Sequence, residues 1–388
     1  MRVLVLTCNT GGGHNACAAA LRDVFTENGH FCEVADAIGF VSEKLSKFLD
    51  WGHTTMYRHI PKLFRFGYGF AEKHPAMLED DAAGYKLLTD GTKELCDYVQ
   101  NGNFDTVICP HVFSGLLVRQ MLREYPMTLK TAFVATDYTC SPGAARSELD
   151  YYFIPAESLR AEYIEQGIPT EKIVATGIPV RKEFYTVAET QTAKREIGID
   201  PSHFHLLMMC GSMGCGPLEK LTKLLGKQMN ENMDLSIICG TNEKLKDELL
   251  ERFGDRSNIH IYGFVKNMNT MMDSADLYLT KPGGLSTSEA AAKRLPMVLI
   301  DAVAGCEEYN RNYFVAVGGA VTAEEPEELA ALCLDLVRDQ TKISSMRSCL
   351  QELTIQNAAV QMREILSKQN ISRLKRPDLC FDRIEEFL

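Results

Sequence analysis

Several features that mark other classes of protein are missing from this sequence. No apolar run reaches the roughly 18 residues of a membrane-spanning helix, so no span is expected. No two of the 13 cysteines form a CxxC pair, which argues against a disulfide framework or a zinc site and favours buried, reduced thiols in cytosol. The first apolar run follows Met1 so closely that no signal peptide is expected. The net charge is −11, which makes general binding to nucleic acid unfavourable.

The length and the hydrophobic pattern predict an α/β protein with two domains. A chain of 388 residues exceeds the size at which one hydrophobic core usually stops growing. Short apolar runs alternate with helical patterns, and this doubly wound rhythm restarts near residue 200. We expect two Rossmann-like domains, residues 1–180 and 181–355, facing a central cleft. A helical segment, residues 356–388, is expected to pack back on the first domain. The expected strands are Val3–Leu6, Phe31–Val34, Thr106–Cys109, Thr131–Ala135, Tyr151–Ile154, Ile173–Ala175, Leu206–Cys210, Leu235–Cys239, His260–Tyr262, Leu277–Leu279 and Met297–Ile300.

Three consecutive glycines follow the first expected strand. Gly11, Gly12 and Gly13 precede His14 and an alanine-rich stretch that favours a helix. Glycine can take positive φ, so the turn can leave backbone N–H groups exposed beside the helix N-terminus. Such a terminus suits an anion such as a phosphate. Taken alone, a glycine turn is more often only a tight turn that binds nothing.

A second glycine turn follows a later expected strand, which ends at Lys281-Pro282. Gly283 and Gly284 turn the chain, and a hydroxyl residue at 286–288 can cap a helix whose first turn holds Glu289. The helix N-terminus suits a diphosphate, and the acceptor-only carboxylate of Glu289 can take two hydroxyls of a ribose. The alternative is an ordinary capped helix.

This second turn resembles the donor-site motif of a known enzyme family. KPGGLSTSEAAAKRLPMVL (281–299) is similar to that motif in the GT-B glycosyltransferases of family 28, and TGGGH, TDYT (136–139), TGIPVR (176–181) and YGFVKNM (262–268) fall in matching order. Within the family the sequence most resembles the diacylglycerol glycosyltransferases, both monogalactosyldiacylglycerol synthases and processive diacylglycerol glucosyltransferases. The resemblance spans roughly residues 1–365 and implies the GT-B fold with a UDP-sugar as donor substrate and no cofactor.

The resemblance also implies roles for single residues. Phe264 matches the position whose backbone reads the nucleotide base, Glu289 the ribose-binding acid, and Arg181 an arginine near the donor phosphates. His14 matches a histidine beside acceptor and donor, in the acceptor-side turn that contains Gly11, Gly12 and Gly13. The other donor-binding matches are Gly211, Ser212, Gly283, Gly284, Leu285, Ser286, Thr287, Glu307 and Asn310.

Two departures from the family pattern affect specificity. The family often has Gln in the run before its last cleft helix, where AGCEEYN (304–310) has Cys306. Cysteine is a weak hydrogen-bonding group, so the identity of the sugar is left open. Lipid-acting members often carry a histidine shortly after the TD segment, where this chain reads TDYTCSPG, which leaves acceptor handling open.

The transfer requires a base for the acceptor hydroxyl. His14 is the first choice because the pKa of histidine lies near neutrality, and Asp137 is the second because it ends an expected strand facing the same cleft. A capping role for His14 and a turn role for Asp137 stay open. No metal site is expected, since the fold type generally works without one and no DxD motif lies beside a strand.

A basic and aromatic segment, residues 44–74, stands out in the acidic chain. It interleaves cationic and aromatic side chains in a helical pattern, which suits an anionic membrane surface. We expect membrane contact from Trp51, Arg58, Lys62, Phe64 and Arg65, and hence a cytoplasmic protein held peripherally on the inner face of the cell membrane. The alternative is a pair of amphipathic helices packed on the first domain.

These observations favour an inverting hexosyltransferase that uses UDP-glucose or UDP-galactose and diacylglycerol to make a glycolipid. Transfer of N-acetylglucosamine to a polyprenyl-linked lipid, a UDP-sugar epimerase and a non-catalytic UDP-sugar binder are the alternatives. A nicotinamide dehydrogenase is disfavoured because neither GGGHNA nor GSMGCG is a clean GxGxxG.

Overall fold

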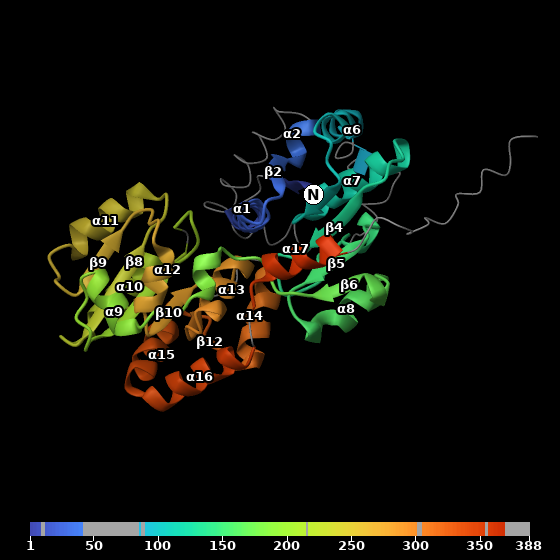
Figure 1. Ribbon diagram of the computed structural model, residues 1–388. Coiled ribbons are helices and arrows are strands. Elements are labelled where there is room, and N and C mark those ends of the chain that lie inside the picture. Colours follow the sequence, from blue (N-terminus) through green and yellow to red (C-terminus); the bar gives the residue numbers. More distant parts are fainter. Residues whose placement is uncertain are drawn as a thin grey trace, which may run out of the picture.

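The chain folds into two α/β domains that lie side by side (Figure 1). The computed structural model describes residues 1–8, 12–41, 85–86, 90–214, 216–300, 305–353 and 356–368. Each domain is built on a six-stranded parallel sheet. The predicted class, α/β with two Rossmann-like domains, is confirmed.

The first sheet has the order β2-β1-β3-β4-β5-β6. β1 lies inside it because the run from Val3 to Leu6 is apolar on both faces, and all four side chains are fully buried. The strands are β1 (Arg2–Thr7), β2 (Phe31–Asp36), β3 (Thr106–Cys109), β4 (Lys130–Val134), β5 (Tyr151–Ile154) and β6 (Ile173–Ala175). The α-helices are α1 (Gly12–Glu27), α2 (Ala37–Val41), α6 (Thr92–Asn101), α7 (Val112–Glu124) and α8 (Arg160–Glu165).

The second sheet has the order β9-β8-β7-β10-β11-β12, which is the strand order of a doubly wound dinucleotide-binding sheet. Its strands are β7 (Phe204–Met209), β8 (Met233–Ile238), β9 (Ile259–Tyr262), β10 (Leu277–Thr280), β11 (Met297–Leu299) and β12 (Ala320–Thr322). Its helices are α9 (Thr190–Glu196), α10 (Leu218–Gly226), α11 (Glu243–Phe253), α12 (Met268–Ser274), α13 (Gly284–Ala292), α14 (Cys306–Val317), α15 (Pro326–Arg338) and α16 (Gln340–Glu352).

The chain crosses between the domains twice, and one side chain joins the two crossings. It leaves the first domain through the 3-10 helix η5 (Lys182–Tyr185) and returns as α17 (Ala358–Lys368), which lies beside β4 and β5 in Figure 1. Lys130 Nζ, at the start of β4, donates to the carbonyl of Leu366 on this helix at 2.7 Å. The Tyr185 hydroxyl accepts from the backbone N–H of Val180 at 3.5 Å and of Ala358 at 3.3 Å.

A buried ion pair anchors the first crossing to the second domain. Lys293 Nζ lies 2.7 Å from Asp273 Oδ2, and both side chains are almost fully buried. Lys293 also donates to the carbonyl of Thr186, and the other Asp273 oxygen accepts from the N–H of Ala188 at 3.3 Å. Burial raises the pKa of Asp273, whereas its partner Lys293 lowers it. These bonds hold residues 186–188 against α12 and α13.

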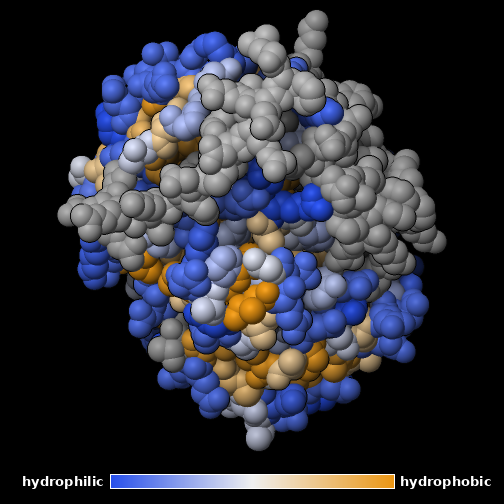
Figure 2. Space-filling model, turned by 90° about the vertical axis from the view of Figure 1, so that its right-hand side faces the viewer, coloured by the Kyte–Doolittle hydropathy of each residue, from blue (hydrophilic) through white to orange (hydrophobic). Residues whose placement is uncertain are grey.

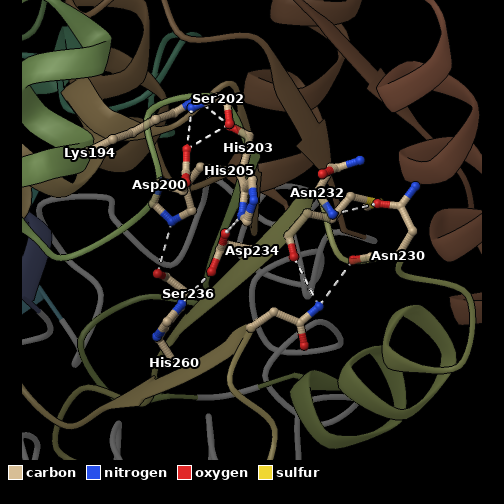
Figure 3. A network of polar contacts seen from close by, with 12 residues as sticks. Lys194, Asp200, Ser202, His203, His205, Asn230, Asn232, Asp234, Ser236 and His260 are labelled. Atoms are coloured by element: carbon tan, nitrogen blue, oxygen red, sulfur yellow. Dashed lines mark hydrogen bonds and ion pairs between the residues drawn. The ribbon is translucent and has the colours of Figure 1, made fainter.

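A network of polar contacts lies at the amino ends of the strands in the second sheet (Figure 3). The carboxylate of Asp234, near the start of β8, contacts His203 Nδ1 at 2.7 Å and His260 Nε2 at 2.6 Å. The ring of His205 bonds the hydroxyls of Ser236 and Ser274 at 2.9 and 3.1 Å. Open α/β sheets bind ligands at the carboxyl ends of their strands, so we interpret this opposite-end network as structural.

On the face in Figure 2 the described surface is mostly hydrophilic, with apolar residues gathered in patches. None of the helices in the described ranges is both long and apolar enough to cross a membrane. No disulfide joins the cysteines in these ranges.

Candidate active site

The glycine turns recognised in the sequence lie at the point in each sheet where successive strands are added on opposite sides of the first strand. In the first sheet β1 and β3 are neighbours, so the segments that follow them, with His14 and His111, meet at the carboxyl edge. In the second sheet β7 and β10 are neighbours, and they are followed by Gly211 and by Lys281 to Gly284. Ligands of open α/β sheets bind at such points. The two points also touch each other across the domain interface, as the following contacts show.

His14 lies in the first turn of α1 with its tautomer set by the backbone. Its Nδ1 is 2.9 Å from the carbonyl oxygen of Pro110, which can only accept, so Nδ1 carries the hydrogen and Nε2 has the free electron pair in the neutral ring. The Thr136 hydroxyl lies 3.3 Å from Nδ1, and the His111 ring centroid lies 4.6 Å from that of His14. Burial lowers the pKa of His14 below its ordinary value, while Asp137 acts to raise it. A neutral imidazole at pH 7 can accept a proton at Nε2.

Asp137 follows β4 and is held by the second domain. Asn310 Nδ2 donates to Asp137 Oδ1 at 2.8 Å and to the Pro282 carbonyl at 2.9 Å, while Asn310 Oδ1 accepts from the N–H of Tyr138 at 2.6 Å. The Tyr138 hydroxyl lies 3.1 Å from Ser288 Oγ. The two predicted base candidates thus share one interface, since Asp137 is close enough to His14 to affect its pKa.

The helix after β10 begins earlier than predicted, and its N-terminus has no side-chain cap. α13 starts at Gly284, and Gly283 in the N-cap position provides no side-chain hydrogen bond. The predicted caps at 286–288 are wrong, because Thr287 and Ser288 lie inside the helix and bond back to the carbonyls of Gly283 and Gly284 at 2.9 and 2.7 Å. Glu289 therefore lies in the second turn. The first N–H groups of α13 have no acceptor within the helix, and no side chain of the N-cap residue takes one, as an anion site requires.

Close packing between the domains explains several of the glycines. Gly12 and Gly13 form the first turn of α1 without positive φ, so a left-handed turn is not their role. A Cβ on Gly12 would lie 2.9 Å from Ser212 Oγ, and a Cβ on Gly284 would overlap the Thr136 carbonyl. Gly13 faces Leu285. The N-termini of α1 and α13 therefore meet across the interface, and both helix dipoles favour negative charge there.

Glu289 is a partly buried carboxyl on α13 of the second domain. Burial raises its pKa to about 7, Arg181 lowers it and Glu183 raises it further. Arg181 itself pairs with Glu183 at 3.1 Å, and its guanidinium lies 5.4 Å from the centre of the Phe184 ring. A carboxyl with this pKa changes charge near neutral pH.

Polar contacts also organise the start of α14. Lys281 Nζ donates to Glu307 Oε1 at 2.9 Å, and a Cβ on Gly211, whose φ is +74°, would lie 2.9 Å from Lys281 Cε. Cys306 lies beside this pair. Burial raises the pKa of the Cys306 thiol, and Asp137 and Glu307 raise it further, so the thiol stays protonated.

Two family models match most of the chain. The first, described as monogalactosyldiacylglycerol (MGDG) synthase, matches residues 14–180, and the second, the glycosyltransferase family 28 C-terminal domain, matches residues 205–362. Together the two models identify the chain as a glycosyltransferase.

Relatives named processive diacylglycerol beta-glucosyltransferase are similar to this glycosyltransferase over nearly its whole length. The Bacillus cytotoxicus protein is 26% identical, over 95% of this chain and 94% of its own. The Bacillus cereus (strain B4264) protein is 27% identical, with the same two shares.

Solved structures confirm the GT-B fold. Acinetobacter baumannii MurG matches with a TM-score of 0.67 at 13% identity, covering 95% of this chain and 99% of its own. Anabaena Alr3699/HepE in complex with UDP matches with a TM-score of 0.57 at 14% identity, covering 95% of this chain and 100% of its own.

One predicted residue of this glycosyltransferase is largely exposed, and others lie outside the described ranges. Phe264 follows β9 and is 64% exposed. Gly11 and the predicted membrane residues, Trp51, Arg58, Lys62, Phe64 and Arg65, lie outside the described ranges.

The structure adds residues that the sequence did not indicate. Pro110 and His111 contact His14, Thr136 contacts His14 and Gly284, and Lys281 pairs with Glu307. The Pro-His pair directly after β3 was the available signal, since it repeats the position of the glycine turn after β1.

Proposed function

We propose that this glycosyltransferase is an inverting hexosyltransferase that moves a hexose from a UDP-sugar to diacylglycerol and so makes a glycolipid. One observation carries the proposal. His14, with Nε2 available for a proton, and Asp137 on the first domain lie at the same interface as the uncapped N-terminus of α13 on the second.

This arrangement supplies both functions that the transfer requires. The acceptor oxygen attacks the anomeric carbon on the face opposite the diphosphate, and its proton passes to His14 Nε2. The bond between the anomeric carbon and the diphosphate oxygen breaks, and the electron pair leaves with UDP. The N–H groups and dipoles of α1 and α13 are fixed before the reaction, so they stabilise the developing charge without reorganising.

The donor residues follow from the same geometry. Gly283, Gly284 and Leu285 place their backbone at the α13 N-terminus for the diphosphate, and ionised Glu289 accepts two ribose hydroxyls. UDP is the nucleotide in the Anabaena complex, which favours a UDP-sugar here.

The hexose is the finer part of the proposal. Relatives named beta-glucosyltransferases favour glucose over galactose. Cys306 provides a weak hydrogen-bonding group beside Glu307, so Cys306→Gln tests whether this position sets the sugar preference.

The acceptor belongs to the first domain in this proposal. A hollow of about 270 Å³ lies beside α1 at the carboxyl ends of β1 and β2, with Thr7, Asn15, Arg22 and Asp36 among its lining residues. We propose that it receives the polar end of the lipid, while the basic and aromatic segment 44–74 holds the enzyme peripherally on the inner membrane face.

The test measures UDP release from UDP-glucose, UDP-galactose and UDP-N-acetylglucosamine, each with anionic liposomes that contain diacylglycerol, a polyprenyl-linked lipid or neither. We expect release that depends on diacylglycerol and prefers one hexose. Release with N-acetylglucosamine on a polyprenyl-linked lipid instead would replace the acceptor and donor proposed here. Tight UDP-sugar binding without release on any lipid would refute the transferase activity.

A further inference from the structure

We infer that Asn310 is a positioning residue that sets the place of Asp137 beside His14 and does not act through the donor sugar. This inference rests on the proposed function, and it concerns an interaction between the two domains.

Both N–H donors of Asn310 are committed to protein groups. A carboxamide has two N–H donors and a carbonyl oxygen with two lone pairs. One N–H of the Asn310 side chain donates to Asp137 Oδ1 and the other donates to the carbonyl of Pro282. The side-chain oxygen of Asn310 accepts from the backbone N–H of Tyr138. The side chain is fully buried. Asn310 therefore has no hydrogen left to donate to a sugar hydroxyl.

The orientation of the carboxamide is determined by its partners. The Pro282 carbonyl can only accept, and the Tyr138 N–H can only donate, so the nitrogen and oxygen of Asn310 cannot be exchanged without losing both bonds. The nitrogen consequently faces Asp137 as a donor. Asn310 thus fixes the position of Oδ1 of Asp137.

The contact exists only when the domains meet. Asn310 lies on α14 of the second domain, whereas Asp137 and Tyr138 follow β4 of the first. Tyr138 also stacks on Tyr313 of α14, with ring centroids 4.3 Å apart. Docking of this loop on α14 therefore places Asp137 at the same time as it forms the interface.

The readout is the pKa of His14, measured by NMR titration of its imidazole in the full chain without substrate. The charged and titratable groups around His14 are Asp137 after β4 and His111 before α7, and the second domain adds Cys306, Lys281 and Glu307 near Asp137. Of these, Asp137 raises the pKa of His14. Any variant that lets Asp137 move away should lower that pKa.

We expect Asn310→Ala and Asp137→Asn each to lower the midpoint of His14, and Asn310→Ala to have no further effect in the Asp137→Asn background. Asn310→Leu keeps the side-chain volume and should act like Asn310→Ala, which covers the case that the alanine variant fails to fold. Ser288→Ala is the matched control, because it removes a bond to Tyr138 in the same loop without touching Asp137. It should leave the midpoint in place.

In the active enzyme, Asn310→Ala should reduce kcat by about tenfold to a hundredfold through misplacement, with little change in KM for the donor. The acid limb of the kcat profile should move to lower pH together with the midpoint. A donor-sugar role would raise KM and leave the midpoint unchanged, and that result would overturn the inference. If the wild-type enzyme shows no lipid-dependent UDP release while the His14 titration midpoints behave as expected, the proposed function is refuted and the positioning role of Asn310 stands.

Discussion

The backbone carbonyl of Thr136 lies so close to Gly284 that a Cβ on the glycine would overlap it. Thr136 belongs to the first domain and Gly284 begins α13 of the second. A carbonyl of one domain therefore packs directly on the helix terminus that we propose for the diphosphate.

Gly284→Ala should separate the domains. The methyl group meets backbone atoms that cannot rotate away, so the interface must open, and small-angle scattering should show a larger radius of gyration. Gly283→Ala is the matched control, since its Cβ would only touch Lys281 Cε at 3.8 Å. Equal radii for the two variants would show that the domains do not meet in this way in solution.

His14→Ala should lower kcat by about 10²-fold or more and change donor affinity little, because removal of a general base affects the chemical step. Steady-state kinetics and UDP-glucose titration separate the two effects. Since burial lowers the pKa of His14, wild-type kcat should persist to a lower pH than an unperturbed histidine allows. Wild-type turnover in the variant would remove His14 as the base.

UDP-glucose binding should weaken as the pH falls through about 7, where Glu289 takes up its proton. The raised pKa means that the ionised carboxylate, which we propose accepts the ribose hydroxyls, is fully formed only above that range. UDP-glucose is preferable to UDP because it lacks a terminal phosphate that titrates near pH 6. Calorimetry on Glu289→Gln should show weaker binding without this pH dependence; the same pH dependence in the variant would assign it to another group.

Charge reversal at Lys62 and Arg65 should release the protein from anionic liposomes in a co-sedimentation assay. Each cation near an anionic surface contributes about 1 kcal/mol, so two reversals have a large combined effect. Reversal of Lys227 and Lys244, exposed on the second domain, is the matched control for net charge. Equal sedimentation of both variants would mean that segment 44–74 does not carry the membrane contact.

Lys293→Met should destabilise the second domain by about 3–5 kcal/mol, because it leaves the Asp273 carboxylate buried without its cation. Adding Asp273→Leu should recover part of the loss, since no buried charge remains. Urea unfolding followed by circular dichroism measures both. A loss below about 1 kcal/mol in the single variant would indicate a solvent-screened pair.

The sequence predicted the two sheets well because their strands are buried on both faces. Runs such as Leu206 to Cys210 are continuously apolar, so no alternation was needed to recognise them. β12 was missed because its three residues, Ala320–Thr322, are too few for any periodicity. The start of α13 was misplaced because hydroxyl residues favour caps in general, whereas Thr287 and Ser288 bond carbonyls inside this helix.

The site could be predicted only as separate pieces. His14, Glu289 and the glycine turns are local motifs, and each was found from its neighbours in the sequence. The bond between Asn310 and Asp137 joins positions 173 residues apart in different domains. No local pattern specifies such a contact, because it depends on how two independently folded sheets dock.

The hydroxyl of Tyr185, which receives N–H groups from both chain crossings, also constrains how the domains can move. Two crossings held together at one point act as a pivot, which permits rotation and opposes sliding. Under rotation, displacement grows with distance from the pivot. The margin of the interface farthest from Tyr185 therefore separates most, and along that margin we expect the proposed UDP-sugar to enter and UDP to leave.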